Sequence, residues 1–278
     1  RILSEVKPKA FVFENVFGIM SAEGGAVFDE IKKQLAEPAE GLAYNISIFR
    51  LNASDFGVPQ FRDRVFIIGY RGSKKRISID PLFGETTGLF PNKLSWRTVR
   101  DGLRDLPAMG APDWHNHQGR KHSQRIIERY AAMKAGERDA RTRINRLNLE
   151  RPSFAIIVGS DAGGGKGHIH PTEPREVTPR ESARMQCFPD WWWFSGTSRH
   201  PIRQIGNAVP TLLGHAVGSS IMRNIFHTNP RSLGDAVELL DQEHLFNSAE
   251  LSKLKDWNYH LSENYLDLPK TSAIQGGG

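Results

Sequence analysis

The chain has 278 residues, of which 38% are hydrophobic and 24% are charged, and its formal net charge is +6. This composition is typical of a soluble globular protein with room for one large domain or two small ones. The single cysteine, Cys187, excludes an internal disulfide framework and a zinc site built mainly on cysteines. No apolar run approaches the roughly 18 residues of a membrane span, so we expect a cytoplasmic protein in a reducing compartment.

The first predicted strand ends at a carboxylate. The apolar run Phe11–Phe13 is followed by the polar residues Glu14 and Asn15. Such a run is typical of a strand that is buried on both faces of a parallel sheet, and ligands bind at the carboxyl ends of strands in open α/β sheets. We therefore interpret Glu14 as a candidate catalytic residue. The alternative is a strand-end glutamate that caps a turn or pairs with an arginine.

The next elements continue an α/β pattern. A helix is predicted over Ala26–Ala36, because apolar residues recur at every fourth position, namely Val27, Ile31 and Leu35. Strands are predicted over Tyr44–Leu51, where apolar residues alternate, and over the apolar run Val65–Gly69.

A polar connection between these two strands carries three hydrogen-bond donors in alternation. Gln60, Arg62 and Arg64 stand two positions apart, so they should project to one side. Guanidinium groups stay charged and offer a fixed fork of donors, which suits an anion or the polar edge of a ring. The alternative is a pair of arginines in salt bridges with Asp55 and Asp63.

The middle of the chain is strongly basic. Between Gly119 and Arg151, ten Lys and Arg residues stand against four acidic residues, which gives this segment a net charge of +6. Such a concentration is typical of a nucleic-acid-binding surface, although a solvated helical face is the alternative. We select these residues of the segment as candidate DNA contacts: Arg120, Lys121, Arg125, Arg129 and Arg143.

A helix with a capping box is predicted after the basic segment. Thr178 can be the N-cap, Pro179 the first helical residue, and Glu181 the reciprocal partner of Thr178. The helix should end near Cys187, and we expect Met185 and Cys187 to belong to the core and not to the chemistry.

A further helix is predicted after Pro210. Its apolar residues recur at every fourth position, namely Leu213, Val217, Ile221 and Ile225. Asn207 stands just before this helix, so its structural alternative is a helix cap. Beyond Phe226 the spacing of Leu239, Leu240 and Leu245 indicates one or two helices of unknown role.

Several local patterns have less specific interpretations. His115, His117, His168 and His170 offer the ligands of a zinc site only if the fold brings them together, and we expect no metal. The His-Asn-His triplet at 115–117 lacks the further ligands of a metal-bound nuclease. The glycine-rich run 163–167 is predicted to be a flexible turn, and the tryptophans 191–193 a packed corner.

Four segments together resemble the DNA cytosine-5 methyltransferases. Lys9–Met20 is similar to the Glu-Asn-Val block of that family, and Asn52–Gly69 to its Gln-x-Arg-x-Arg block. Glu176–Asp190 resembles its Thr-x-Arg-Glu block, and Arg203–Ile221 its closing Gly-Asn-Ala-Val-Pro block. The four blocks stand in the order of the family, which is far more specific than any one of them.

This resemblance implies roles for particular residues. Family enzymes add a cysteine thiolate to C6 of cytosine, and the resulting enamine takes a methyl group from S-adenosyl-L-methionine. By resemblance, Glu14 hydrogen-bonds or protonates N3, Arg64 holds O2, and Arg62 helps to organise the site and a nearby phosphate. The target base is flipped out of double-stranded DNA, to which Gln60 would also bind. The residues implied beside the cofactor are Asn207, Ala208 and Val209.

The resemblance also implies a missing part. The cofactor block and the Pro-Cys block of the family precede its Glu-Asn-Val block, so we expect an amino-terminal segment, truncated or on a separate polypeptide, before Arg1. Cys187 does not replace the nucleophile, because it falls in the late helix block. The chain alone is therefore predicted to be inactive.

The implied architecture is the carboxyl-terminal part of a Rossmann-like, S-adenosylmethionine-dependent α/β domain with a smaller inserted target-recognition domain. Residues 1–75 and 175–227 would belong to the catalytic domain, 76–174 to target recognition, and 228–278 to a helical tail. The alternatives are a non-catalytic DNA-recognition subunit or a tRNA cytosine-5 methyltransferase.

Overall fold

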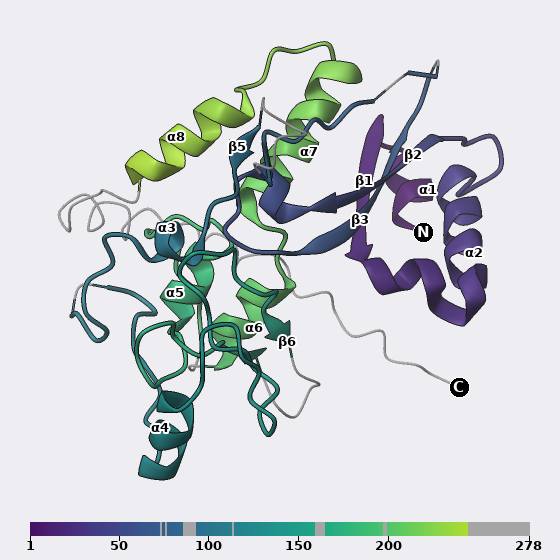
Figure 1. Ribbon diagram of the computed structural model, residues 1–278. Coiled ribbons are helices and arrows are strands. Elements are labelled where there is room, and N and C mark those ends of the chain that lie inside the picture. Colours follow the sequence, from purple (N-terminus) through teal and green to yellow (C-terminus); the bar gives the residue numbers. More distant parts are fainter. Residues whose placement is uncertain are drawn as a thin grey trace, which may run out of the picture.

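The computed structural model describes residues 1–72, 74–75, 77–85, 93–112, 114–158, 165–196 and 199–243 (Figure 1). Its elements in chain order are α1 (Ile2–Val6), β1 (Ala10–Val16), η1 (Phe17–Gly25), α2 (Ala26–Ala36), β2 (Asn45–Asn52), η2 (Ala53–Phe56), β3 (Asp63–Tyr70), β4 (Phe83–Gly84), β5 (Leu94–Ser95), α3 (Val99–Leu103), α4 (Gln124–Ala131), β6 (Ile157–Val158), β7 (Gly165–Lys166), α5 (Pro179–Arg184), α6 (Arg199–Asn207), α7 (Thr211–Asn224) and α8 (Leu233–Glu243). The expected mixture of helices and strands is confirmed. None of the described helices combines the length and hydropathy that a membrane span requires.

The main sheet has three strands in the order β1-β3-β2, and both pairings are antiparallel. The prediction that the Phe11 strand is parallel and buried on both faces is therefore wrong. Val12 of β1 is 45% exposed, and only β3 pairs with β1 within the described residues. The strand that is covered on both faces is β3, where Val65, Ile67 and Ile68 are completely buried.

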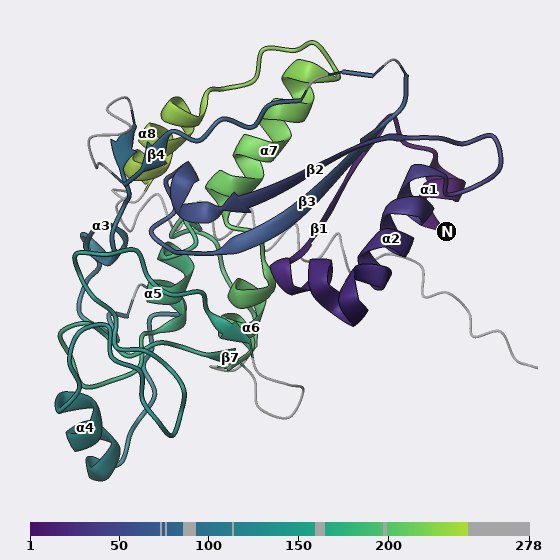
Figure 2. The same cartoon turned by 45° about the vertical axis from the view of Figure 1, so that its right-hand side comes forward.

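Helices cover the two faces of this sheet (Figures 1 and 2). On one face α2 packs against Val65 and Ile67, and the predicted helix over Ala26–Ala36 is confirmed. Ile31 and Leu35 of the predicted apolar stripe pack in this cluster, whereas its third predicted member, Val27, does not, and Phe28 is buried there instead. On the other face, α7 packs against Phe66, Ile68 and Tyr70 of β3.

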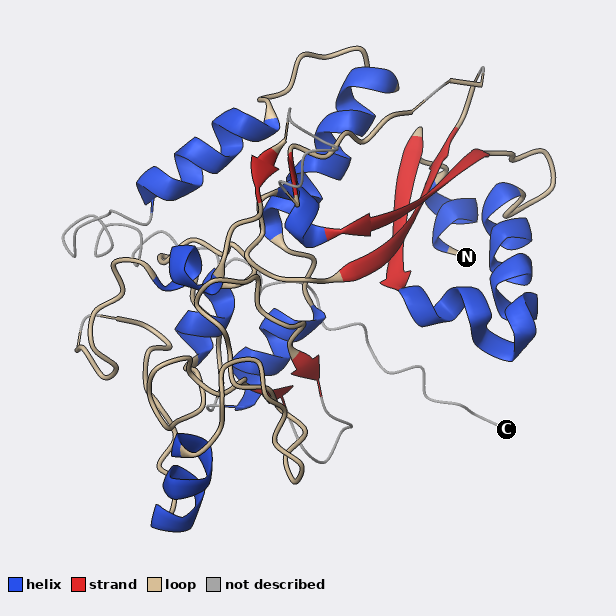
Figure 3. Cartoon of the chain, in the orientation of Figure 1, coloured by secondary structure: helices blue, strands red, loops and turns tan. Residues whose placement is uncertain are grey.

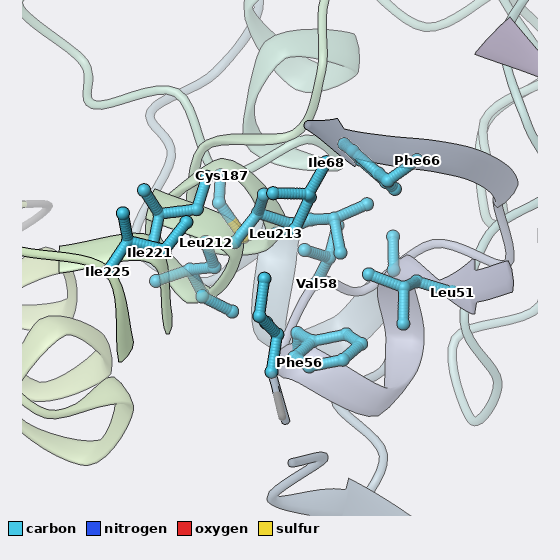
Figure 4. Close-up of a cluster of buried hydrophobic side chains, with 14 of the residues drawn as sticks. Leu51, Phe56, Val58, Phe66, Ile68, Cys187, Leu212, Leu213, Ile221 and Ile225 are labelled. Atoms are coloured by element: carbon cyan, nitrogen blue, oxygen red, sulfur yellow. The ribbon is translucent and has the colours of Figure 1, made fainter. Parts of the chain in front are cut away.

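The largest core cluster lies between α7 and the sheet (Figure 4). Leu213, Val217, Ile221 and Ile225, the residues of the predicted helical stripe, all belong to it, so that prediction is confirmed. Cys187 is part of the same cluster, and burial raises the pKa of its thiol to about 12. A thiol in this state is inert, as expected for a core residue.

The capping box at the start of α5 is formed as predicted. The Thr178 hydroxyl accepts a hydrogen bond from the Glu181 amide at 3.1 Å, and the Glu181 carboxylate accepts one from the Thr178 amide at 2.7 Å. Two buried arginines of α5 hold other segments against it. Arg180 donates to the carbonyls of His115 and Pro189, and Arg184 forms a buried ion pair with Asp190 at 2.5 Å. The arginines of the Arg-Glu block therefore stabilise the fold, because they make contacts inside the protein.

The long stretch between β5 and α5 is mostly loop (Figure 3). Its longest helix is α4, which lies at the end of the molecule away from the main sheet (Figures 1 and 2). The expected packed corner of tryptophans is formed only in part, because Trp192 and Trp193 are 44% and 58% exposed. In the tail, α8 confirms a helix with Leu240 in the core, whereas Leu245 lies outside the described residues.

Candidate active site at the ends of β1 and β3

Glu14 and Arg64 meet at one end of the main sheet. Glu14 lies opposite Phe66, and Arg64 lies opposite Val16, so the two side chains form a diagonal cross-strand pair on one face. A Glu14 carboxylate oxygen lies 2.9 Å from Nε of Arg64, and their side chains are 25% and 14% exposed. The alternative that Glu14 pairs with an arginine is thus realised, and its partner is the other predicted catalytic residue.

Arg64 is shared between its carboxylate partner and the backbone. Its Nη1 donates to the Asp63 carbonyl at 2.8 Å. Burial lowers the pKa of Arg64, and the charge of Glu14 opposes this change. The Glu14–Arg64 pair leaves Oε2 of Glu14 and Nη2 of Arg64 without a hydrogen bond inside the described part of the chain. A carboxylate oxygen and a guanidinium nitrogen are therefore left for a ligand.

Arg62 connects the sheet to a segment far along the chain. Its Nη2 donates to the carbonyl of Gly206 at 2.7 Å and to that of Ala208 at 3.0 Å. Burial and the charge of Arg64 lower the pKa of Arg62 to about 10. Nε and Nη1 of Arg62 are buried with no hydrogen-bond partner among the described residues. The alternative that Arg62 and Arg64 form salt bridges to Asp55 and Asp63 side chains is wrong.

The turn that carries these arginines is organised by Asn52, which sequence reasoning missed. The Asn52 side-chain oxygen accepts hydrogen bonds from the amides of Ser54 and Arg62, at 3.2 and 3.1 Å. An Asn before a short polar turn was the available signal. Gln60 is completely buried, and both atoms of its side-chain amide lack a partner within the described residues. The predicted row of three donors on one side is therefore not formed, and DNA contact by Gln60 stays a prediction.

The three predicted cofactor residues lie where α6 ends. Asn207 is the last residue of α6 and is exposed, while Ala208 and Val209 are half-buried. The cap expected for the following helix is wrong, because Pro210 occupies that position. A Cβ added to Gly206 would lie 2.4 Å from a methyl carbon of Val158, so the absence of a side chain lets α6 approach β6. Arg62 thus fixes the segment through the carbonyls on either side of Asn207.

The predicted DNA-binding residues fall into two groups. Arg120 forms an ion pair with Glu176 at 3.1 Å, and Arg129 forms one with Asp139 at 3.0 Å. In the second group the side chains are exposed and have no hydrogen bond or ion pair within the described residues, namely Lys121, Arg125 and Arg143. DNA binding by this second group stays a prediction.

The histidines of the zinc alternative are engaged individually. His117 contacts the Thr178 hydroxyl at 2.9 Å and the Pro107 carbonyl at 3.0 Å. His168 contacts the Ala155 carbonyl at 3.1 Å, and burial lowers its pKa. Within the described ranges no group of three His, Cys, Asp or Glu side chains is arranged to hold a metal ion.

Comparison with a family model and with known proteins identifies the same family. Residues 1–223 match the family model described as C-5 cytosine-specific DNA methylase. The chain is 31% identical to the type II methyltransferase M.XorII of Xanthomonas oryzae pv. oryzae, covering 87% of this chain and 65% of that protein. It is 34% identical to the type II methyltransferase M.BsuRI of Bacillus subtilis, covering 80% of this chain and 51% of that protein. The chain thus spans between half and two thirds of these relatives.

Solved structures give the same result for the fold. A crystal structure described as a DNA modification methyltransferase encoded within an E. coli prophage is 27% identical, with a TM-score of 0.64, over 82% of this chain and 72% of that chain. The S. pombe Dnmt2 methyltransferase is 18% identical, with a TM-score of 0.51, over 78% of this chain and 65% of that chain, and supports the fold alone. The chain therefore belongs to the C-5 cytosine-specific DNA methylase family.

Proposed function

We propose that this chain is the carboxyl-terminal part of a DNA cytosine-5 methyltransferase. In this proposal, Glu14 and Arg64 hold the flipped cytosine while a methyl group is transferred to its C5. The observation that carries the proposal is the pairing of these two residues across β1 and β3, in a chain whose family acts on cytosine.

The chemistry of the base edge suits this pair. Cytosine presents an acceptor at N3, a donor at its 4-amino group and an acceptor at O2. Glu14 binds or protonates N3 and orients the amino group, and Arg64 donates to O2 through Nη2, which has no hydrogen bond among the described residues. Charge develops on N3 when a thiolate adds to C6, so a carboxylic group positioned there acts as the acid–base partner of the reaction.

Arg62 fixes the segment after α6 beside the Glu14–Arg64 pair. It holds the carbonyls of Gly206 and Ala208, and its two unsatisfied buried nitrogens favour a further acceptor outside the described residues. Because Arg62 is only 2% exposed, a DNA phosphate could supply this acceptor only if the segment around Arg62 rearranges.

The cofactor of this family is S-adenosyl-L-methionine, which supplies the methyl group when it is bound. The residues present fit the edge of its pocket, because Asn207 offers an exposed amide beside the half-buried apolar surface of Ala208 and Val209. In the proposal these three residues bind and orient the cofactor, and the remainder of its pocket comes from an amino-terminal part.

The free edge of β1 supports such a partner. Val12 and Val16 of β1 are 45% and 52% exposed, and β1 has no neighbour on its outer side within the described ranges. Exposed edges of this kind are usually paired or covered, because they invite aggregation. We propose that an amino-terminal part, on the same or a separate polypeptide, adds its strand here and brings the nucleophilic cysteine. Cys187 is buried in the core and does not replace it.

The region 76–174 is proposed to recognise double-stranded DNA. The two groups of basic residues support different roles, in which Arg120 and Arg129 stabilise the region through their ion pairs while the exposed Lys121, Arg125 and Arg143 contact DNA. Gln60 is too deeply buried to join them unless the turn around it rearranges.

Reconstitution tests the proposed function. The 278-residue chain is co-expressed with an amino-terminal part from a family relative, and transfer of labelled methyl groups from S-adenosyl-L-methionine to double-stranded DNA is measured. We expect transfer by the combination and none by the chain alone. A combination that binds DNA but transfers nothing would favour the non-catalytic recognition subunit, and transfer only to tRNA would favour the tRNA enzyme.

A further inference from the structure

Two short antiparallel segments joined by a turn lie in the basic region between Gly136 and Arg146, with an isolated bridge between Arg138 and Asn145. The Gly136 amide donates to the Arg146 carbonyl, and the Arg146 amide donates to the Glu137 carbonyl, both at 2.8 Å. Nearer the tip, the Asp139 amide donates to the Ile144 carbonyl at 2.8 Å. Two segments linked in this way form a short two-stranded ribbon that ends in a turn.

The tip of this ribbon is anchored from inside. Ile144 is completely buried in a cluster with Tyr130 of α4 and Ile169. The Asp139 side chain is also buried, accepts hydrogen bonds from the amide and hydroxyl of Thr142, and pairs with Arg129 of α4 at 3.0 Å. The turn is therefore held rigidly against α4.

Two arginines remain on the outside of the anchored turn. Arg141 and Arg143 flank the inward-facing Thr142, are exposed, and have no side-chain partner among the described residues. Arg143 has a φ of 65°, a left-handed conformation that an arginine rarely adopts, and its carbonyl accepts a hydrogen bond from Arg138 at 3.0 Å. The turn thus keeps a long cationic side chain where glycine or asparagine would be relaxed.

We propose that Arg141 and Arg143 read guanines in the major groove of the DNA target. The inference rests on the proposed function and specifies which element selects the sequence. The major groove admits a two-stranded ribbon, and an arginine fork matches the O6 and N7 acceptors of guanine. A rigid tip suits base reading, since the side chains are presented without ordering a flexible loop on binding.

The test uses the full 278-residue chain and a library of DNA duplexes with a randomised centre. The variants are Arg141→Gln, Arg143→Gln and Arg143→Gly, with Arg71→Gln as the control, an exposed arginine after the opposite end of β3 from Arg64. Arg143→Gly removes the side chain but relieves the left-handed conformation, so its thermal stability should equal or exceed that of the parent. A loss of DNA binding that is caused by misfolding can thereby be distinguished from a loss of guanine recognition.

We expect the parent chain to enrich sequences with guanine at defined positions. Each variant at 141 or 143 should lose guanine selection at one position, with affinity for the parental sequence falling about 5- to 150-fold and affinity for unrelated duplexes falling little. At the position where Arg143→Gly loses guanine selection, guanine is replaced by 7-deazaguanine, which lacks the N7 acceptor. This replacement should weaken DNA binding by the parent but not by Arg143→Gly.

Three results would overturn the inference: no sequence selection by the parent, unchanged selection by the variants, or equal weakening on all sequences with a flatter salt dependence. The last result would make these arginines phosphate contacts. Methyl transfer by the reconstituted enzyme is measured in parallel. If transfer persists while guanine selection is unaffected by the variants, the reading role fails and the proposed function stands.

Discussion

Arg64 reaches Glu14 diagonally across two antiparallel strands, with Nε 2.9 Å from the carboxylate. The pairing of Glu14 with Phe66 and of Val16 with Arg64 puts both side chains on the face of Phe66, which packs in the core cluster with α7. Two sequence blocks separated along the chain thereby become one site, with one oxygen and one nitrogen left for a ligand.

Replacement of Arg64 by alanine should slow methylation in the reconstituted enzyme and also loosen retention of the flipped base. The reason is that Ala removes the proposed donor to O2 and leaves Glu14 without its ion-pair partner. The flipped base is followed by the fluorescence of 2-aminopurine at the target position, which should fall. Arg64→Lys is the matched control, since it keeps the charge but not the fork of donors. Unchanged fluorescence in Arg64→Ala would remove the base-holding role.

Replacement of Arg62 by alanine should destabilise the chain by about 2–3 kcal/mol, because charge-assisted hydrogen bonds to two carbonyls are lost at a buried position. Urea denaturation measures the loss. The exposed Arg71 serves as the control, and its alanine variant should lie within about 0.5 kcal/mol of the parent. An Arg62→Ala chain as stable as this control would show that Arg62 does not hold the Gly206–Ala208 segment.

The local elements could be predicted from the sequence because each has a short-range signal. The helix Ala26–Ala36 follows from its apolar spacing, and the helix from Pro179 follows from its capping box. The stripe from Leu213 to Ile225 identified the helix that covers the sheet. The resemblance to the family blocks also identified Glu14 and Arg64 as site residues, although it did not predict that they contact each other.

Long-range features had no local signal. An apolar run such as Phe11–Phe13 does not distinguish a parallel interior strand from an antiparallel one with a free edge. The bonds from Arg62 to Gly206 and Ala208 join residues 144 and 146 positions apart. The burial of Gln60 and the internal ion pairs of Arg120 and Arg129 likewise depend on tertiary contacts, so charge and alternation alone overestimated the number of exposed donors.

The basic residues of α4 and of the segment before it should differ in how much they contribute to the salt dependence of DNA affinity. Lys121→Gln and Arg125→Gln should each flatten the dependence of DNA affinity on salt by about one unit of slope, since exposed cations release counterions from phosphates. Arg129→Gln should instead lower stability, because Arg129 pairs with the buried Asp139. DNA titrations at several salt concentrations measure the slopes. Equal slopes for the parent, Lys121→Gln and Arg125→Gln would return these residues to the solvated-face interpretation.

Asp139 should make stability depend on pH. Burial raises the pKa of its carboxyl, but hydrogen bonds from Thr142 and the charge of Arg129 outweigh burial, so the pKa lies below the ordinary 3.8. A lowered pKa in the folded state means that the stabilisation is present above the unfolded value and is lost as the pH falls through the folded value. Asp139→Asn should therefore cost about 1–2 kcal/mol near neutral pH.

Chemical denaturation of the parent and Asp139→Asn across the acidic range checks this prediction. The difference between the two proteins should shrink as the pH falls below 3.8. Asp235, an exposed acid at the start of α8, provides the control variant Asp235→Asn. A difference that stays constant over the whole range would mean that Asp139 acts through shape and not through its charge.

The rate of methyl transfer by a reconstituted Glu14→Gln enzyme tests the central claim most directly. Gln keeps the size of the side chain and a hydrogen-bond acceptor for Arg64, but it cannot exchange a proton with N3. Positioned acid–base groups contribute on the order of 10²- to 10⁴-fold, so we expect the rate to fall by about that factor while DNA affinity changes little. Glu30→Gln, on the exposed face of α2, is the control and should transfer at the parental rate. A Glu14→Gln enzyme that also methylates at the parental rate would contradict the role assigned to the Glu14–Arg64 pair.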